Sequence, residues 1–204
     1  MIDERKDFVA EAHVLLVHTG RMSHDDLQRV AELLHERDRI DDQIAAIMER
    51  PMTSGHLGEW IAAQVFDIEL ERSATTTAFN GRFRSGPLQG RTVNVKWYLK
   101  REGLLDMTTS EALNDYLVLT GRVSAAVSSH GRTRPWCIVS VYLFDAHGLR
   151  AEMLARGRSI GTASSIRTEL WNQAEIYPKP ANTRMLLSDR QVEALKLFAP
   201  AQRT

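Results

Sequence analysis

Seven basic side chains and no carboxylate occur in the thirty residues between Arg72 and Arg101. The bases are Arg72, Arg82, Arg84, Arg91, Lys96, Lys100 and Arg101. Because a quarter of the chain is charged, an acid-free stretch of this length indicates a local positive surface, which suits the phosphates of a nucleic acid. The alternative is that these bases are solvated and pair with acids elsewhere in the chain, such as those of the N-terminal arm.

Asn94 and Lys96 lie in this stretch and alternate with Val93, Val95 and Trp97. Alternation of this kind is typical of a half-buried strand, in which residues two apart point to the same face. Asn94 and Lys96 therefore form a polar pair on a strand predicted over residues 91–99. The simplest interpretation of Lys96 is the outward residue of an amphipathic strand; the alternative is a cation that stabilises charge at a bound phosphate.

The pattern of residues 51–204 predicts an α+β fold, a mixed α/β sandwich. A helix over 54–66 precedes a strand over 68–79, and Asn80-Gly81 is typical of a hairpin turn in which both residues have positive φ. The remaining elements are a short strand at 82–84, a turn at 86–90, the strand at 91–99, a short helix after Thr108, buried strands at 115–121 and 135–146, and helices at 149–156, 165–176 and 188–198.

Residues 1–50 predict a separate helical hairpin, with helices over 3–18 and over 23–50. This arm holds seven basic and twelve acidic residues, so its net charge is −5, whereas the predicted domain 51–204 has a net charge of +5. The apolar faces of the hairpin are expected to pack on the domain or on a second copy of the chain.

The composition of the 204 residues is ordinary for a globular protein: 43% are hydrophobic and the net charge is zero. The single cysteine, Cys137, excludes an internal disulfide and a cysteine-based zinc site, and the histidines lack metal-ligand spacing. No apolar run reaches the length of a membrane span, and the polar N-terminus is unlike a signal peptide. We therefore expect a cytoplasmic protein without a membrane partner.

Over residues 54–200 the chain resembles the PD-(D/E)XK superfamily, which has the restriction-endonuclease-like fold. The resemblance lies in the segments GEWIAAQVFDIELE, FNGRF, GPLQGRTVNVKWY, EGLLD, DYLVLTG, RPWCIVSVYLFD and IGTASSIRTELWNQAEIYP. It implies a site formed by Glu59, Asn80, Asn94 and Lys96, with Glu59 and Asn80 as ligands of Mg²⁺ or Mn²⁺. It further implies contacts of Arg82, Arg84, Arg91, Lys100 and Arg101 with double-stranded DNA, and a homodimer.

The chain departs from the superfamily pattern at Asn80 and Asn94, where that pattern has carboxylates. An amide oxygen is neutral and is a poor replacement for the charge that holds Mg²⁺. We therefore predict a nucleic-acid-binding protein that is catalytically degenerate or atypical. One alternative is an active metal-dependent endonuclease, in which Asn80 is deamidated or stands where an active form has aspartate. The other is a non-enzymatic module that oligomerises through residues 1–50.

Overall fold

The computed structural model describes residues 24–71, 79–123 and 135–200. The chain divides into two units, Met1–Ile47 and Met48–Thr204, and each is described by itself. In the first unit, helix α1 (His24–Met48, of which Met48 belongs to the second unit) begins with Asp25 and Asp26, whose negative charge favours a helix N-terminus. It confirms the helix predicted over 23–50, whereas the helix predicted over 3–18 lies outside the described residues.

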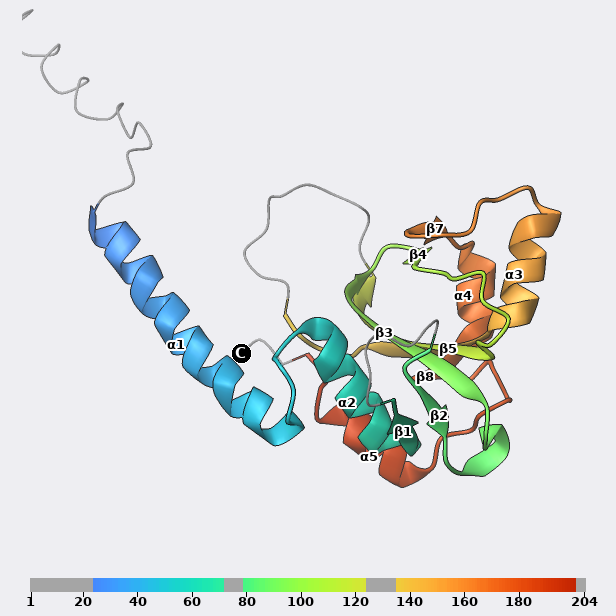
Figure 1. Cartoon of the computed structure of the whole chain (residues 1–204), viewed down its shortest axis with the longest axis horizontal. Helices are drawn as coiled ribbons and strands as arrows, with labels where there is room; N and C mark the ends of the chain where they lie inside the picture. The colour runs from blue at the N-terminus through green and yellow to red at the C-terminus, as the bar shows by residue number, and fades with distance from the viewer. Residues whose placement is uncertain (1–23, 72–78, 124–134, 201–204) are drawn as a thin grey trace, which may run out of the picture. The chain divides into compact units, whose positions relative to one another are not determined.

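The second unit contains a six-stranded sheet in the order β1-β2-β3-β5-β6-β8 (Figure 1). Its strands are β1 (Ile68–Leu70), β2 (Gly81–Phe83), β3 (Thr92–Arg101), β5 (Asp115–Val123), β6 (Ser140–Asp145) and β8 (Glu175–Tyr177). Neighbouring strands are antiparallel except for β3 and β5, which are parallel. The chain crosses between these two through β4 (Leu104–Leu105), which pairs with β7 (Ser164–Ser165) in a separate small sheet. The predicted α+β class is confirmed.

Helices cover both faces of the sheet (Figure 1). On one face, α2 (Ser54–Phe66) and α5 (Asp189–Lys196) enclose a core that includes Ile61, Val95 and Leu117. On the other face, α3 (Ala146–Ala155) and α4 (Thr168–Ala174) enclose a second core that includes Tyr116 and Trp171. Because side chains alternate along a strand, β3 and β5 contribute to both cores. No helix in the described ranges is long and apolar enough to span a membrane.

Local signals placed several helix ends correctly. Thr53 caps α2 by accepting a hydrogen bond from the His56 N–H, and Ser188 with Gln191 forms the predicted capping box of α5. The prediction of a helix after Thr108 is wrong: the Thr108 hydroxyl instead accepts a bond from the Ser110 N–H in an irregular segment. The predicted helix over 165–176 is only partly right, since it ends in strand β8.

The predicted hairpin turn at Asn80-Gly81 is wrong, because Gly81 is the first residue of β2 and pairs with Leu70 and Val93. Neither residue has the positive φ that this turn requires. Glycine is needed here for packing, since a Cβ at this position would lie 2.3 Å from the carbonyl oxygen of Glu69. The turn predicted at 86–90 is confirmed: η1 (Gly86–Leu88) begins with Gly86 at positive φ, and Gly90 also has positive φ.

Candidate functional site

Glu59 lies on α2, and both of its carboxylate oxygens are bound by side chains. Arg50 donates to Oε2 at 2.7 Å, and Asn80 donates from Nδ2 to Oε1 at 2.9 Å. Only 13% of the Glu59 side chain is exposed, so its charge depends on these partners in place of water. The sequence analysis did not include Arg50 in the site, because Arg50 precedes the basic stretch and no other basic residue lies near it in the sequence.

Asn80 joins α2 to the central strand β3. Its Oδ1 accepts a hydrogen bond from the backbone N–H of Val95 at 2.6 Å, and its own backbone N–H donates to Val93 O at 2.8 Å. The side chain thus accepts a hydrogen bond from a backbone N–H of β3, immediately before β2 begins to pair with that strand. An amide can make both contacts at once because it carries an acceptor and a donor.

The close approach of α2 to β3 depends on Gly58. A Cβ at this position would lie 2.7 Å from the Cβ of Trp97, so a larger residue would push the helix away from the strand. Trp97 is buried beneath the helix and packs edge-on against Trp136, with ring centroids 5.8 Å apart. Glu59 follows Gly58 directly, and this packing therefore sets the position of its carboxylate.

Asn94 and Lys96 lie on the sheet face that α2 does not cover. Their neighbours on β5 are Tyr116 and Val118, which belong to the core beneath α3 and α4. Val93, Val95 and Trp97 point instead into the core beneath α2. The structure therefore brings Glu59 and Asn80 together, and it places Asn94 and Lys96 together on the opposite face. Within the described ranges, the Lys96 ammonium forms no ion pair.

The basic residues predicted to contact DNA divide into two groups. Arg84 pairs with Asp67, and Lys100 pairs with Glu102, as the alternative interpretation of the basic stretch expects. Arg82 and Arg101 have no ion pair among the described residues. Arg82 lies 5.0 Å from the ring centroid of Phe79, and Arg101 lies 5.7 Å from those of Tyr142 and Trp171.

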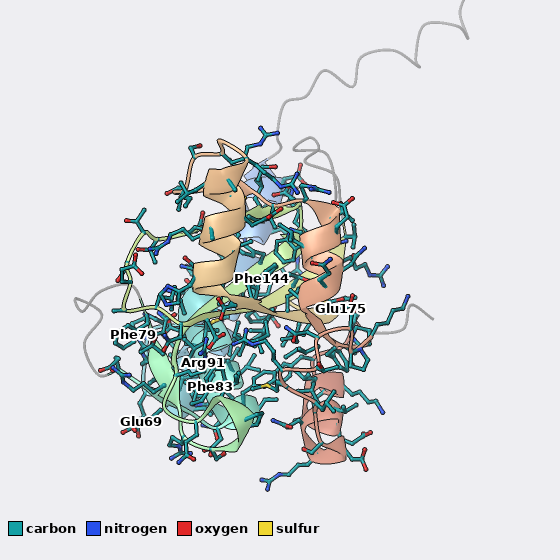
Figure 2. All side chains as sticks on the ribbon, turned by 90° about the vertical axis from the view of Figure 1, so that its right-hand side faces the viewer. Glu69, Phe79, Phe83, Arg91, Phe144 and Glu175 are labelled. Atoms are coloured by element: carbon teal, nitrogen blue, oxygen red, sulfur yellow. The ribbon has the colours of Figure 1, made fainter. Side chains whose placement is uncertain are left out.

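Arg91, the fifth predicted DNA contact, belongs to a partly buried network of charges. Its Nε donates to Asp115 at 2.6 Å, and Arg184 donates to the other oxygen of the same carboxylate at 2.8 Å. Asp115 is fully buried, and the more exposed Asp145 accepts from Arg91 at 3.1 Å. The hydrogen bond with Asp115 raises the pKa of Arg91. In Figure 2, Arg91 lies beside Phe83, whose backbone N–H donates to the Arg91 carbonyl oxygen at 3.1 Å.

Sequence reasoning did not identify the other three members of this network, Asp115, Asp145 and Arg184. Asp115 opens a strand in which the next six residues are also buried, and a buried acid in such a strand is a sequence signal for an ion pair. Arg184 gives no such signal, because it lies 69 residues further along the chain. The two arginines and two aspartates balance in charge, so this network stabilises the fold and leaves Arg91 unavailable to a phosphate.

The donor set around Glu59 does not fit the Mg²⁺ or Mn²⁺ that the resemblance implies. These ions prefer charged oxygen ligands, whereas among the described residues the Asn80 side chain bonds to a single carboxylate, that of Glu59. Both of its oxygens are already engaged by N–H donors. Across residues 24–71, 79–123 and 135–200, no three histidine, cysteine, aspartate or glutamate side chains are grouped to hold a metal ion. The site is built to neutralise one carboxylate with an arginine and an amide.

Comparison with known proteins adds no assignment. The sequence matches no protein-family model. It also matches no curated protein closely enough to indicate kinship.

Proposed function

We propose that this chain binds double-stranded DNA through a restriction-endonuclease-like core that does not cleave it. The order of elements supports the kinship: a helix with Glu59, an antiparallel trio β1-β2-β3, and a further strand, β5, parallel to β3. The observation on which the proposal depends is the hydrogen bond between Asn80 and Glu59, because it joins two of the three positions at which the superfamily pattern has carboxylates.

The absence of catalysis follows from the chemistry of the same residues. Asn80 and Asn94 are neutral, and the Glu59 carboxylate is occupied by Arg50 and Asn80. Lys96 points to the opposite face of the sheet from α2, so it is poorly placed to share one phosphate with Glu59. Of the two versions of the nuclease hypothesis, these contacts favour the catalytically degenerate one over an active Mg²⁺- or Mn²⁺-dependent endonuclease.

Lys96, Arg82 and Arg101 supply the charge for sequence-independent phosphate contacts, because none is neutralised by an acid among the described residues. Counterion release makes such binding strongly dependent on salt. A labelled duplex titrated with the full chain tests the proposal by fluorescence anisotropy. We expect affinity to fall by about tenfold or more between about 50 and 200 mM salt, as for a protein that contacts at least two phosphates. Absence of binding at the lower salt concentration would refute the proposal.

A plasmid incubated with the chain and Mg²⁺ or Mn²⁺ distinguishes the two enzymatic alternatives. We expect the supercoiled plasmid to remain intact. Nicking or linearisation that EDTA abolishes, and that persists in preparations whose Asn80 is shown by mass spectrometry to be unmodified, would establish an active nuclease in place of a DNA-binding protein.

A further inference from the structure

Helix α1 exposes six large apolar side chains. Each member of the set is between 46% and 68% exposed: Leu27, Val30, Leu33, Leu34, Ile40 and Ile47. Helices in proteins owe most of their stability to packing of an apolar face against other structure. The exposed set therefore indicates that α1 packs against a further helix or surface.

The spacing of these residues defines a seam with a seven-residue repeat. Val30, Arg37 and Ile44 occupy one position of the repeat, conventionally a. Leu33, Ile40 and Ile47 occupy the other seam position, d, three residues further along. Leu27 and Leu34 lie beside the seam at position e. Five of the six seam residues are apolar, and the exception, Arg37, lies near the middle.

We propose that α1 pairs antiparallel with α1 of a second copy of the chain. In this arrangement each a residue faces a d residue of the other copy: Val30 faces Ile47, Ile44 faces Leu33, and Arg37 faces Ile40. A two-fold axis between Asp38 and Arg39 relates the copies, so all six seam residues of each helix are paired. The seam of one copy therefore matches the seam of the other, and the pairing needs no further apolar surface.

Two features favour the antiparallel over the parallel arrangement. In a parallel pair, Arg37 would face Arg37 of the second copy, and like charges would meet in the seam. In the antiparallel pair Arg37 instead faces Ile40, which is adjacent to Asp41 of the second copy. Within its own helix, the Nε of Arg37 already lies 3.3 Å from the Oδ2 of Asp41, so each charge at the centre has an opposite charge beside it.

The residues beside the seam give the second feature. In an antiparallel pair the e positions of the two helices face each other, so in this register Leu34 faces Asp41 and Leu27 faces Met48 of the second copy. In a parallel pair the e positions would face the g positions, and Asp41 would lie opposite Glu36 of the second copy, so like charges would meet a second time. The acids Glu32, Asp38 and Asp42 lie at outer positions of the repeat, so the interface does not bring them together.

The oligomeric state of the full chain tests this proposal and is independent of DNA. We expect light scattering at micromolar concentration to give the mass of a dimer. The variant Ile40→Glu places a charge in the seam and should halve that mass. The matched control His35→Glu adds the same charge to the same helix at position f, opposite the seam, and should remain dimeric. A monomeric wild-type chain, or equal masses for the two variants, would overturn the proposal.

Disulfide crosslinking tests the orientation. Chains carrying Arg37→Cys, mixed under oxidising conditions with chains carrying Ile40→Cys, should form the mixed disulfide in preference to either homodimer. The native thiol at Cys137 is buried and gives little background. Efficient self-crosslinking of Ile40→Cys alone would show a parallel pair and would contradict the proposed arrangement. The seam residues belong to the first unit and the six-stranded sheet to the second, so each variant can be checked for a folded core by its near-ultraviolet circular dichroism.

Discussion

Asn80 donates its side-chain N–H to the carboxylate of Glu59 at 2.9 Å, while its carbonyl oxygen accepts the backbone N–H of Val95 at 2.6 Å. One amide thus joins helix α2 to the central strand. A carboxylate in this position could keep the contact with Val95 but would repel Glu59. The neutral asparagine therefore allows Asn80 and Glu59 to be in contact without a bound cation, and it accounts for the poor fit of the site to a divalent metal.

Replacing Asn80 with aspartate should make the fold responsive to divalent metal. The variant Asn80→Asp places two carboxylates in contact, so we expect a loss of about 1–3 kcal/mol in the free energy of unfolding, as for a hydrogen bond to a charged group converted to repulsion. Mn²⁺ should recover part of the loss, because it bridges two carboxylates. Thermal unfolding with and without Mn²⁺ measures both effects.

The wild-type chain and the variant Asn80→Ala are the controls for this prediction. Neither places a second carboxylate beside Glu59, so Mn²⁺ should leave their melting temperatures unchanged. A wild-type chain stabilised by Mn²⁺ as strongly as Asn80→Asp would contradict our interpretation of the donor set.

The packing of α2 on β3 predicts opposite effects for two glycines of the same helix. Gly58→Ala would place a Cβ 2.7 Å from that of Trp97, and we expect a loss of about 1–3 kcal/mol in the free energy of unfolding. Gly55→Ala meets only the Thr53 hydroxyl at 3.9 Å, so the higher helix propensity of alanine should leave stability unchanged or raise it by up to about 1 kcal/mol. Urea denaturation compares the two variants, and equal stabilities would refute the packing argument.

The buried charge network predicts an asymmetry between its two aspartates. Asp115→Asn removes a fully buried charge that serves both Arg91 and Arg184, and it should cost about 3–5 kcal/mol in the free energy of unfolding. Asp145→Asn removes a carboxylate that is 42% exposed and retains an oxygen for the Gly148 N–H, so its cost should be at most about 1 kcal/mol. Chemical denaturation gives both values, and a larger loss for Asp145→Asn would contradict the assigned roles.

Acid should weaken the contacts of Asp67. Hydrogen bonds from Ser85 and Arg84 lower the pKa of this carboxyl below its ordinary value of 3.8. A carboxyl with a lowered pKa in the folded state stabilises the fold above its unfolded pKa, and this stabilisation disappears as the pH falls through the folded pKa. The difference in stability between the wild-type chain and Asp67→Asn should therefore shrink as pH falls below about 4. If the stability difference between the wild-type chain and Asp67→Asn stays constant from neutral to acidic pH, the charge of the Asp67 carboxylate does not contribute to that difference.

The regular elements were predictable where the signal was local. The alternation of Val93, Val95 and Trp97 identified β3, and Ser188 with Gln191 identified the start of α5. The errors arose where tertiary contacts override local preference. Asn80-Gly81 has the composition of a hairpin turn, but a strand forms there because Asn80 bonds to Glu59 and Val95, and because Gly81 fits against the Glu69 carbonyl.

The candidate site was predictable only in part. The order of elements predicts that Glu59 and Asn80 approach the same strand, and the structure brings them together. The pairing of Arg84 with Asp67 and of Arg91 with Asp115 could not be assigned from sequence, because the partners lie 17 and 24 residues apart along the chain. The number of basic residues in the sequence is therefore larger than the number of cations that can bind a ligand.

The most direct test of the proposed DNA-binding surface compares two cations of the basic stretch. Lys96 has no ion pair among the described residues, whereas Arg84 is neutralised by Asp67. If the surface binds DNA phosphates, Lys96→Gln should weaken duplex binding severalfold and reduce its salt dependence by about one phosphate, and Arg84→Gln should change neither. Equal affinity and equal salt dependence for wild type and Lys96→Gln would contradict the account.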